Sequence, residues 1–305
     1  MEKIIVTGGA GFIGSHIVDA LIGEGYEVHI VDNLSTGKKE NVNRKAVLHV
    51  ADIRDKEKLI SIFKDAKYVF HEAALPQVQY SIENPIETHE INVTGLLNVL
   101  EASRLNNVKR LIFASSSAVY GNQETLPLVE TMEPCPLSPY GTHKYIGEIY
   151  CGLWSRIYNL ETVSLRYFNV YGKGQSSTGA YASVIVKFMD LKKAGSPLTV
   201  TGTGEQTRDF INIKDVVSAN LQAMKSTKVG KGEVINIGST YRVSVNEITE
   251  LIGGPVEYIE ARIEPADTQA DITKTKELLD WEPKVKLEDG LAELKDFNNI
   301  IGYEQ

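Results

Sequence analysis

Two residues four positions apart could carry out proton transfer. Tyr140 and Lys144 stand in the stretch "LSPYGTHKY", directly after Pro139. At positions i and i+4 of a helix, their side chains would project from one face. A tyrosine with a pKa near ~10 is a poor base at neutral pH, but a nearby ammonium lowers that pKa by favouring the phenolate. We therefore expect Tyr140 to act as a base with Lys144 as its electrostatic partner. The alternative is an exposed surface pair.

A glycine-rich loop near the N-terminus has the spacing of a dinucleotide-binding turn. In "VTGGAGFIGSH", Gly9, Gly11 and Gly14 form the pattern G-x-G-x-x-G, and Gly8 adds a second spacing. Glycines permit a tight turn and close approach of the backbone to a pyrophosphate, and the N-terminus of the following helix attracts the phosphates. The alternative is a glycine-rich turn in some other α/β protein.

Two carboxylates could complete this dinucleotide site. Asp32 follows Gly14 by 18 residues and ends the second predicted strand. A carboxylate there accepts both hydroxyls of an adenosine ribose and repels a 2′-phosphate, so NAD is favoured over NADP. Asp52, in "VADIRD", could reach the adenine edge or could cap the helix expected from Lys56 onward.

Strands that alternate with helices must position these residues. Short buried runs and helical spacings alternate through the first half of the chain, which implies parallel strands in a doubly wound, Rossmann-type α/β sheet. The predicted strands are 3–7, 28–31, 47–52, 67–74, 110–116 and 162–169, and the predicted helices are 12–23, 56–64, 85–106 and 140–158.

The alternation weakens after about Tyr171. Two amphipathic segments, 182–195 and 214–226, are interleaved with short strands, and the tail reads as helix, turn, helix. We predict a Rossmann domain over 1–171, with later strands near 207–240 returning to it. The remainder, 172–305, is predicted to be a smaller mixed α/β domain.

Composition narrows the class of protein. The chain has 305 residues and a net charge of −8 with dispersed basic residues, which argues against nucleic-acid binding. Its two cysteines lack the spacing of a disulfide framework or a zinc site, so we expect a reducing compartment and no metal. No apolar run reaches ~18 residues, so we expect no membrane span. The opening "MEKIIVTGG" lacks a signal-peptide layout, and we expect a cytoplasmic protein.

Several motifs together resemble one family. "TGGAGFIG", "DNLSTG", "HEAA", "SSSAVYG", "PYGTHK" and "RYFNVYG", in this order, resemble the extended short-chain dehydrogenase/reductase family, in its nucleotide-sugar epimerase/dehydratase branch. The resemblance implies a tightly bound NAD+ and a nucleotide-sugar domain over 172–305. The cofactor-binding residues that it implies are Gly8, Gly11, Phe12, Ile13, Gly14, Asp32, Asn33, Ser35, Thr36, Gly37, Asp52, Ile53, Ala73, Ala74, Tyr140 and Lys144.

The serine motif discriminates between reactions within the family. By the family's spacing, the catalytic hydroxyl falls on Ser116, with Ser115 and Ser117 as alternates. Family members that dehydrate carry an Asp-Glu pair directly after this residue, and those that decarboxylate keep the Glu. Here the positions hold Ser117 and Ala118. The resemblance therefore implies C4 epimerisation of a UDP-hexose, with or without an N-acetyl group. The alternatives are a net oxidoreductase and a non-catalytic NAD-binding regulator.

The resemblance also implies substrate contacts. Arg208, in "GEQTRDFINIKDV", would bind the nucleotide diphosphate, with an ion pair to Asp209 or Glu205 as the alternative. Asn169 would contact a phosphate, with a satisfied turn amide as the alternative. Ser116 and Ser117 would face the sugar.

The remaining candidates surround the sugar. "ARIEPADTQADITK" keeps Arg262 as a second phosphate ligand, but the segment is one residue shorter than the family pattern. Thr268 falls at the size gate beside C2 of the sugar, and its small side chain favours a pocket that admits N-acetyl groups. Gln77 and Tyr80 are further candidates to line the sugar pocket.

The family also implies an oligomer. Its equivalents of the predicted helices 85–106 and 140–158 form a two-fold, four-helix contact. We therefore expect a homodimer with the same interface.

Overall fold

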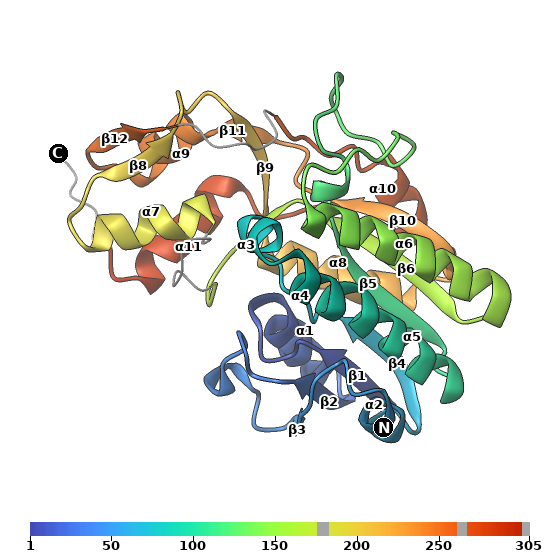
Figure 1. Ribbon diagram of the computed structural model, residues 1–305. Coiled ribbons are helices and arrows are strands. Elements are labelled where there is room, and N and C mark those ends of the chain that lie inside the picture. The colour runs from blue at the N-terminus through green and yellow to red at the C-terminus, as the bar shows by residue number, and fades with distance from the viewer. Residues whose placement is uncertain (176–182, 261–266, 301–305) are drawn as a thin grey trace.

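Runs of buried apolar residues form seven parallel strands (Figure 1). The structure is a computed structural model, and it describes residues 1–175, 183–260 and 267–300. In spatial order the sheet consists of β10 (Lys231–Ile237), β6 (Glu161–Tyr167), β5 (Arg110–Ser116), β4 (Ala66–His71), β1 (Lys3–Thr7), β2 (Glu27–Asp32) and β3 (Val47–Val50). The chain order reverses between β1 and β4. In such sheets, ligands bind at this switch point, outside the carboxyl ends of the strands. The predicted doubly wound fold is confirmed.

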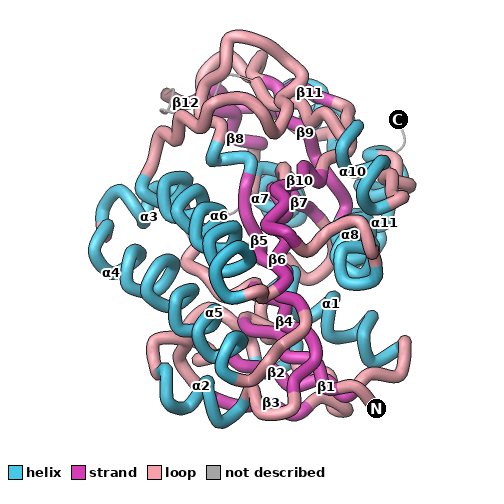
Figure 2. The backbone as a smooth tube through the Cα atoms, turned by 90° about the vertical axis from the view of Figure 1, so that its right-hand side faces the viewer, coloured by secondary structure: helices cyan, strands magenta, loops and turns pink. Residues whose placement is uncertain are grey.

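Helices cover both faces of the sheet, which Figure 2 shows nearly edge-on. One face packs against α1 (Phe12–Gly23), α8 (Ile213–Lys225) and α10 (Thr273–Leu279). The other packs against α2 (Lys56–Ile62), α5 (Gly95–Leu105) and α6 (Pro139–Tyr158). The inner strands are therefore buried on both sides, which accounts for their nearly continuous apolar runs, whereas the edge strand β3 is more exposed.

A smaller mixed α/β part lies beyond the carboxyl edge (Figure 1, left). β7 (Asn169–Tyr171), β9 (Thr207–Asn212) and β11 (Arg242–Ser244) form one sheet, and β8 (Leu198–Thr201) pairs with β12 (Val256–Ile259). A separate apolar cluster joins these strands to α7 (Val184–Lys193), α9 (Val245–Ile252) and α11 (Leu287–Phe297).

The helix predicted over 85–106 is confirmed over 85–105, with one irregularity that was not predicted. α4 (Pro85–His89) continues through a π-helical turn (Glu90–Thr94) directly into α5. The buried side chain of Asn92 lies in this stretch and bonds both backbone groups of Leu75, accepting from its N–H at 2.8 Å and donating to its carbonyl at 3.0 Å. The irregular turn thus ties the helix to the chain that follows β4.

Other short elements differ from the prediction. The strand predicted over 162–169 ends at Tyr167, and Asn169 begins β7 in the other sheet. "VQYSIE" is a helix, α3 (Val78–Glu83), that was not predicted, and two 3-10 turns occupy Lys39–Asn41 and Ser117–Val119. In the described ranges, no helix combines the length and apolarity that a membrane crossing requires.

Candidate active site

The first turns of α6 bring Tyr140 and Lys144 to the carboxyl edge of the sheet. Ser138 caps the helix by accepting a hydrogen bond from Gly141 N at 3.2 Å, and Pro139 occupies the first turn. The Lys144 ammonium is buried and donates to the carbonyl of Ala114, near the end of β5, at 2.6 Å. Its Nζ lies 5.7 Å from the centre of the Tyr140 ring.

Ser116 ends β5 beside the tyrosine. Its Oγ accepts a hydrogen bond from Ala118 N at 3.1 Å. Burial raises the pKa of Tyr140 to about 12, although a hydrogen bond with Ser116 acts in the opposite direction. This is opposite to the shift expected from Lys144. The reason is that the Tyr140 hydroxyl is desolvated and that the charge of Glu72 also raises its pKa. An additional positive charge nearby would favour the phenolate.

Glu72 is a site residue that sequence reasoning missed. It directly follows β4, and Tyr167 donates a hydrogen bond to its Oε1 at 3.0 Å. Burial raises the pKa of Glu72, while Tyr167 and Lys144 oppose the rise. Burial has the opposite effect on Lys144: it lowers the pKa of the ammonium, and the charge of Glu72 counteracts this lowering. The available signal was the acid in "HEAA", because a carboxylate directly after a buried strand lies at the ligand-binding edge.

Ser115 belongs to the packing beneath the site. Its hydroxyl donates to Glu148 Oε1 at 2.5 Å, and Arg166 binds both oxygens of that carboxylate at 2.8 and 2.7 Å. Ser117 begins the 3-10 turn after β5. Of the three serines, Ser116 is the one that hydrogen-bonds Tyr140.

The glycine loop fits a dinucleotide pyrophosphate. Gly8 has φ of +72°, and a Cβ there would lie 2.6 Å from Ala73 N. A Cβ on Gly14 would collide with the carbonyl oxygen of Gly8. Gly11 is the N-cap of α1, so no side chain caps the first-turn N–H groups, to which Phe12 and Ile13 contribute. A phosphate can therefore approach the backbone of the loop closely and accept hydrogen bonds from the first-turn N–H groups of α1.

Asp32 lies at the other end of this cradle, as an adenosine ribose requires. Its carboxylate accepts from Ala10 N at 3.0 Å and from Leu34 N at 2.8 Å. A Cβ on Gly37 would come within 2.8 Å of both carboxylate oxygens, so only glycine lets the loop pass this close. Asn33 organises the intervening turn by accepting from Ser35 N and Oγ, and the exposed Thr36 follows.

Asp52 does not cap the helix at Lys56, so that alternative is wrong. The cap is Asp55, which accepts from Lys58 N. Asp52 instead accepts a hydrogen bond from Asn33 Nδ2 at 3.0 Å, and its contacts with Arg54 hold its pKa well below the usual range.

Three more expected cofactor residues border this region. The side chain of Ile53 packs in the core against Gly95, so any cofactor contact would come from its backbone. Ala73 and Ala74 follow β4, and the Ala73 backbone lies against Gly8.

Asn169 and Thr268 meet in the smaller part, beside Arg208. Asn169 Nδ2 donates to the carbonyl of Asp209 at 3.2 Å and approaches Thr268 Oγ1 at 3.5 Å. Thr268 is buried, and its hydroxyl accepts from Asp209 N at 3.3 Å. The Asp209 carboxylate, next to Arg208 in the chain, accepts from Ser239, Thr240 and Ala270.

The structure gathers the candidates into three groups: the catalytic cluster, the cofactor cradle and the Arg208 group. Gln77 stands at the N-cap position of α3 without a side-chain capping bond, and the Tyr80 hydroxyl donates to Glu87 at 2.7 Å. The serine of the same helix, Ser81, was not predicted; its Oγ accepts from Tyr140 N at 3.0 Å. Arg262 lies outside the described residues.

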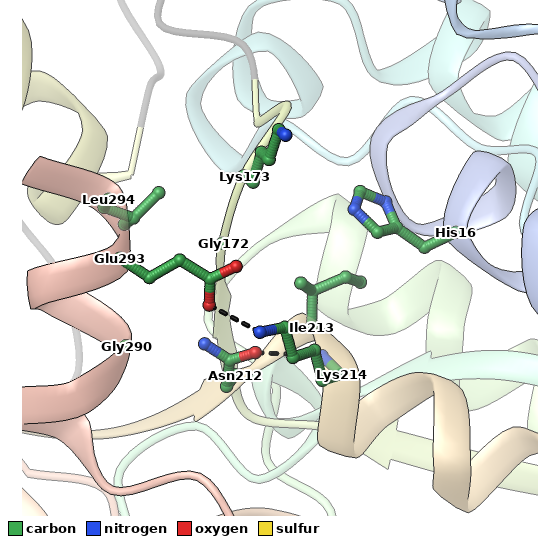
Figure 3. A pocket seen from close by; sticks show the side chains of 9 residues that line it. All are labelled: His16, Gly172, Lys173, Asn212, Ile213, Lys214, Gly290, Glu293 and Leu294. Carbon is green, nitrogen blue, oxygen red and sulfur yellow. Dashed lines mark hydrogen bonds and ion pairs between the residues drawn. The ribbon is translucent and has the colours of Figure 1, made fainter. Parts of the chain in front are cut away.

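A cavity of about 130 Å³ lies apart from these groups (Figure 3). It opens between α1 and α11, and none of the candidate residues lines it. The lining residues are His16, Gly172, Lys173, Asn212, Ile213, Lys214, Gly290, Glu293 and Leu294. An ion pair of 2.6 Å between Lys214 and Glu293 borders it.

Known proteins resemble the chain over most of its length. Residues 4–238 match the model of the NAD-dependent epimerase/dehydratase family. A putative UDP-glucose 4-epimerase of Methanocaldococcus jannaschii is 44% identical over 297 residues, which cover 94% of this chain and 95% of that protein.

Two solved structures are similar along almost the whole chain. The UDP-glucose 4-epimerase of Thermotoga maritima with UDP-glucose has a TM-score of 0.94 at 42% identity, covering 98% of this chain and 99% of that one. The UDP-N-acetylglucosamine 4-epimerase of Methanobrevibacter ruminantium in complex with UDP-N-acetylmuramic acid has a TM-score of 0.93 at 37% identity, with the same coverage.

Proposed function

Because the chain belongs to the NAD-dependent epimerase/dehydratase family, we propose that it interconverts a UDP-hexose and its C4 epimer without net redox change. The substrates in this proposal are UDP-glucose and UDP-galactose, together with their N-acetylated counterparts. NAD is the cofactor of this family, and the proposal requires that it stays bound through the cycle.

One observation carries the choice of reaction. Ser116 and Tyr140 share a hydrogen bond, and the turn that follows Ser116 is formed by Ser117, Ala118 and Val119. None of these three side chains can act as a carboxylic acid or base. Dehydration and decarboxylation need such a group next to the sugar, whereas oxidation and reduction at C4 need only the hydroxyl pair.

In the proposed mechanism, Tyr140 takes the proton of the 4-hydroxyl group, and Ser116 hydrogen-bonds the same oxygen. NAD, when bound, supplies hydride acceptance and return at C4. Lys144 holds cofactor ribose hydroxyls and keeps positive charge near Tyr140. Arg208 suits a diphosphate because its planar fork can bind two oxygens at once. Arg208 and Asn169 would anchor the nucleotide while the 4-keto sugar rotates, so that hydride returns to the opposite face of C4.

We further propose a division of labour along the chain. Residues 1–171 and the later strands near 207–240 would bind NAD. Residues 172–305 would bind the nucleotide sugar, with Thr268 beside C2 and Gln77 reaching the sugar from the first part.

The test uses the purified protein without added cofactor. UDP-galactose and UDP-N-acetylgalactosamine are incubated separately, and NMR follows the C4 configuration. Formation of the gluco epimer of at least one sugar, without accumulation of reduced nicotinamide, is expected. If neither sugar is converted, the proposal fails. In a parallel reaction with added NAD, steady consumption of that NAD would indicate the oxidoreductase alternative instead.

A matched variant tests the assigned base. Tyr140→Phe should lose turnover by at least about a hundredfold, the usual contribution of a general acid–base group. It should retain its NAD, measured after denaturation. Near-normal turnover in this variant would remove Tyr140 from the proposed role.

A further inference from the structure

Glu72 occupies the part of the sheet edge between the glycine loop and Lys144. β4 lies between β1 and β5 in the sheet. Glu72 N donates to the Thr7 carbonyl at 3.1 Å, which extends the pairing of β1 and β4 past their ends. The backbone carbonyl carbon of Glu72 would lie 2.9 Å from a Cβ on Gly8. A dinucleotide that runs from the glycine loop to Lys144 must therefore pass this residue.

A hydrogen-bonded chain fixes the carboxylate across the end of β5. Tyr167, its donor, ends β6, and β5 lies between β4 and β6. Asn220 of α8 in turn donates to the Tyr167 hydroxyl at 2.8 Å and to the Val216 carbonyl at 2.9 Å. The side chain thus has a defined position above the strand that carries Ser116.

The surroundings of Glu72 combine charge with poor solvation. It is partly buried, and the ionisable groups that face it are Lys144 and Tyr140 from α6 and Tyr167 from β6. Among these, Lys144 is the cation, and it already donates to a backbone carbonyl. A further positive charge at this edge would find in Glu72 a counter-ion in a medium where Coulomb interactions are weakly screened.

We infer that Glu72 is the counter-ion of the oxidised nicotinamide ring and gives the site a preference for NAD+ over NADH. The ring is cationic in NAD+ and neutral in NADH, so a carboxylate beside it stabilises the oxidised form selectively. The same carboxylate restrains the ionisation of Tyr140 until the cationic cofactor is bound. The negative charge of Glu72 is then balanced by the nicotinamide cation only when NAD+, the form that accepts hydride, occupies the site.

This inference rests on the family's NAD dependence and not on the sugar that is proposed. Its test contains no sugar, so its failure is distinguishable from failure of the epimerase assignment. The readout is cofactor composition and not activity.

The experiment equilibrates the purified protein with an equimolar mixture of NAD+ and NADH until the bound ratio is constant. Free cofactor is removed, the protein is denatured, and the released NAD+ and NADH are quantified. In Glu72→Gln the bound NAD+/NADH ratio should fall roughly five- to tenfold from wild type, as expected for the loss of one charge from a partly solvated site. Glu57→Gln, the same change on the exposed first turn of α2, should leave the ratio at the wild-type value.

A second variant keeps the acid but removes its donor. Tyr167→Phe loses the hydrogen bond that holds the Glu72 carboxylate, so Glu72 should be more protonated at about pH 7 and ionised again by about pH 9. Relative to wild type at the same pH, the ratio should fall at the lower pH and recover at the higher one. The inference is overturned if Glu72→Gln leaves the bound NAD+/NADH ratio unchanged. This includes the case in which the variant binds both cofactor forms more weakly by the same factor. It is also overturned if Tyr167→Phe lowers the ratio equally at both pH values.

Discussion

Burial, more than residue type, sets the chemistry of individual side chains in this site. Tyr140 and Glu72 both hold their protons more tightly than usual because desolvation disfavours their charged forms. Lys144 releases its proton more easily for the same reason. In the protein without cofactor, burial therefore disfavours the charged forms of all three groups. A bound cation would favour the anionic forms of Tyr140 and Glu72.

The size of residue 268 should decide which sugars are accepted. In Thr268→Tyr we expect kcat/KM for UDP-N-acetylgalactosamine to fall by at least about a hundredfold, because the larger side chain fills the space of the N-acetyl group, while UDP-galactose loses less than about tenfold. Thr268→Ser, which is small and keeps the hydroxyl that accepts from Asp209 N, should keep both activities. Parallel loss of both substrates in Thr268→Tyr would contradict a size gate.

A single methyl group should test the cofactor cradle. Gly14→Ala would place a Cβ against the Gly8 carbonyl oxygen, so we expect the purified protein to contain less than about a tenth of the wild-type NAD. Gly23→Ala, at the other end of α1, meets nothing within 4 Å. It should retain NAD and be as stable as wild type or more stable, by up to about 1 kcal/mol. Equal NAD content in the two variants would show that the cradle tolerates a side chain.

At the level of elements, α3 connects the expected sugar pocket to the catalytic helix. Ser81 is fully buried; its hydroxyl donates to the Val78 carbonyl and accepts from Tyr140 N. The first turn of α6 is thus fixed from two sides, by Ser138 within the helix and by Ser81 from outside. Movement of α3 would be transmitted directly to the Tyr140 backbone.

Loss of this connection should reduce turnover without changing substrate affinity. In Ser81→Ala we expect about 1 kcal/mol less free energy of unfolding and a kcat about fivefold lower, with KM nearly unchanged. Thr142→Ala removes an exposed hydroxyl that bonds the Ser138 carbonyl in the same turn and serves as the control. A larger effect in the control, or an effect confined to KM, would contradict the positioning role.

Sequence patterns predicted those elements whose signals are local. The bounds of α1 and β5 follow from the glycine loop and an apolar run, and both were obtained to the residue. The π-helical turn at 90–94 was not predicted, because Asn92 in this turn bonds Leu75 of another segment. Ser81 was missed for the same reason, because its partner Tyr140 is set by helix packing, which no local pattern contains. Glu72 did carry a local signal, its place directly after β4, but its bond with Tyr167 depends on strand order.

At the level of the whole molecule, α6 leaves an apolar stripe exposed. Ile149 is 49% exposed and Ile157 is 57% exposed, two turns apart on one face. Ile86 of α4 and Leu105 of α5, also exposed, lie on the neighbouring helices. We propose that these helices form the two-fold, four-helix contact of a homodimer, since a stable interface needs such an apolar centre.

A charge in this stripe should separate the subunits. Ile149→Glu is expected to sediment as a monomer at micromolar concentration while the wild-type protein sediments as a dimer, because an unpaired carboxylate would be buried at the contact. Val47→Glu introduces the same charge on the exposed strand β3 and should leave the dimer intact. A monomeric wild-type protein would refute the proposed interface.

The late position of β10 in the chain affects how the protein can fold during synthesis. β6 stays an open sheet edge until residues 231–237 have left the ribosome. Asn236 then supplies the bonds that close the structure, accepting from the Tyr120 hydroxyl at 2.7 Å and donating to the Leu128 carbonyl at 2.9 Å. An unpaired strand at the sheet edge invites association with other nascent chains. We therefore expect chains that stall before residue 231 to depend on chaperones, and chains long enough for residues 231–237 to have left the ribosome to be protected by β10.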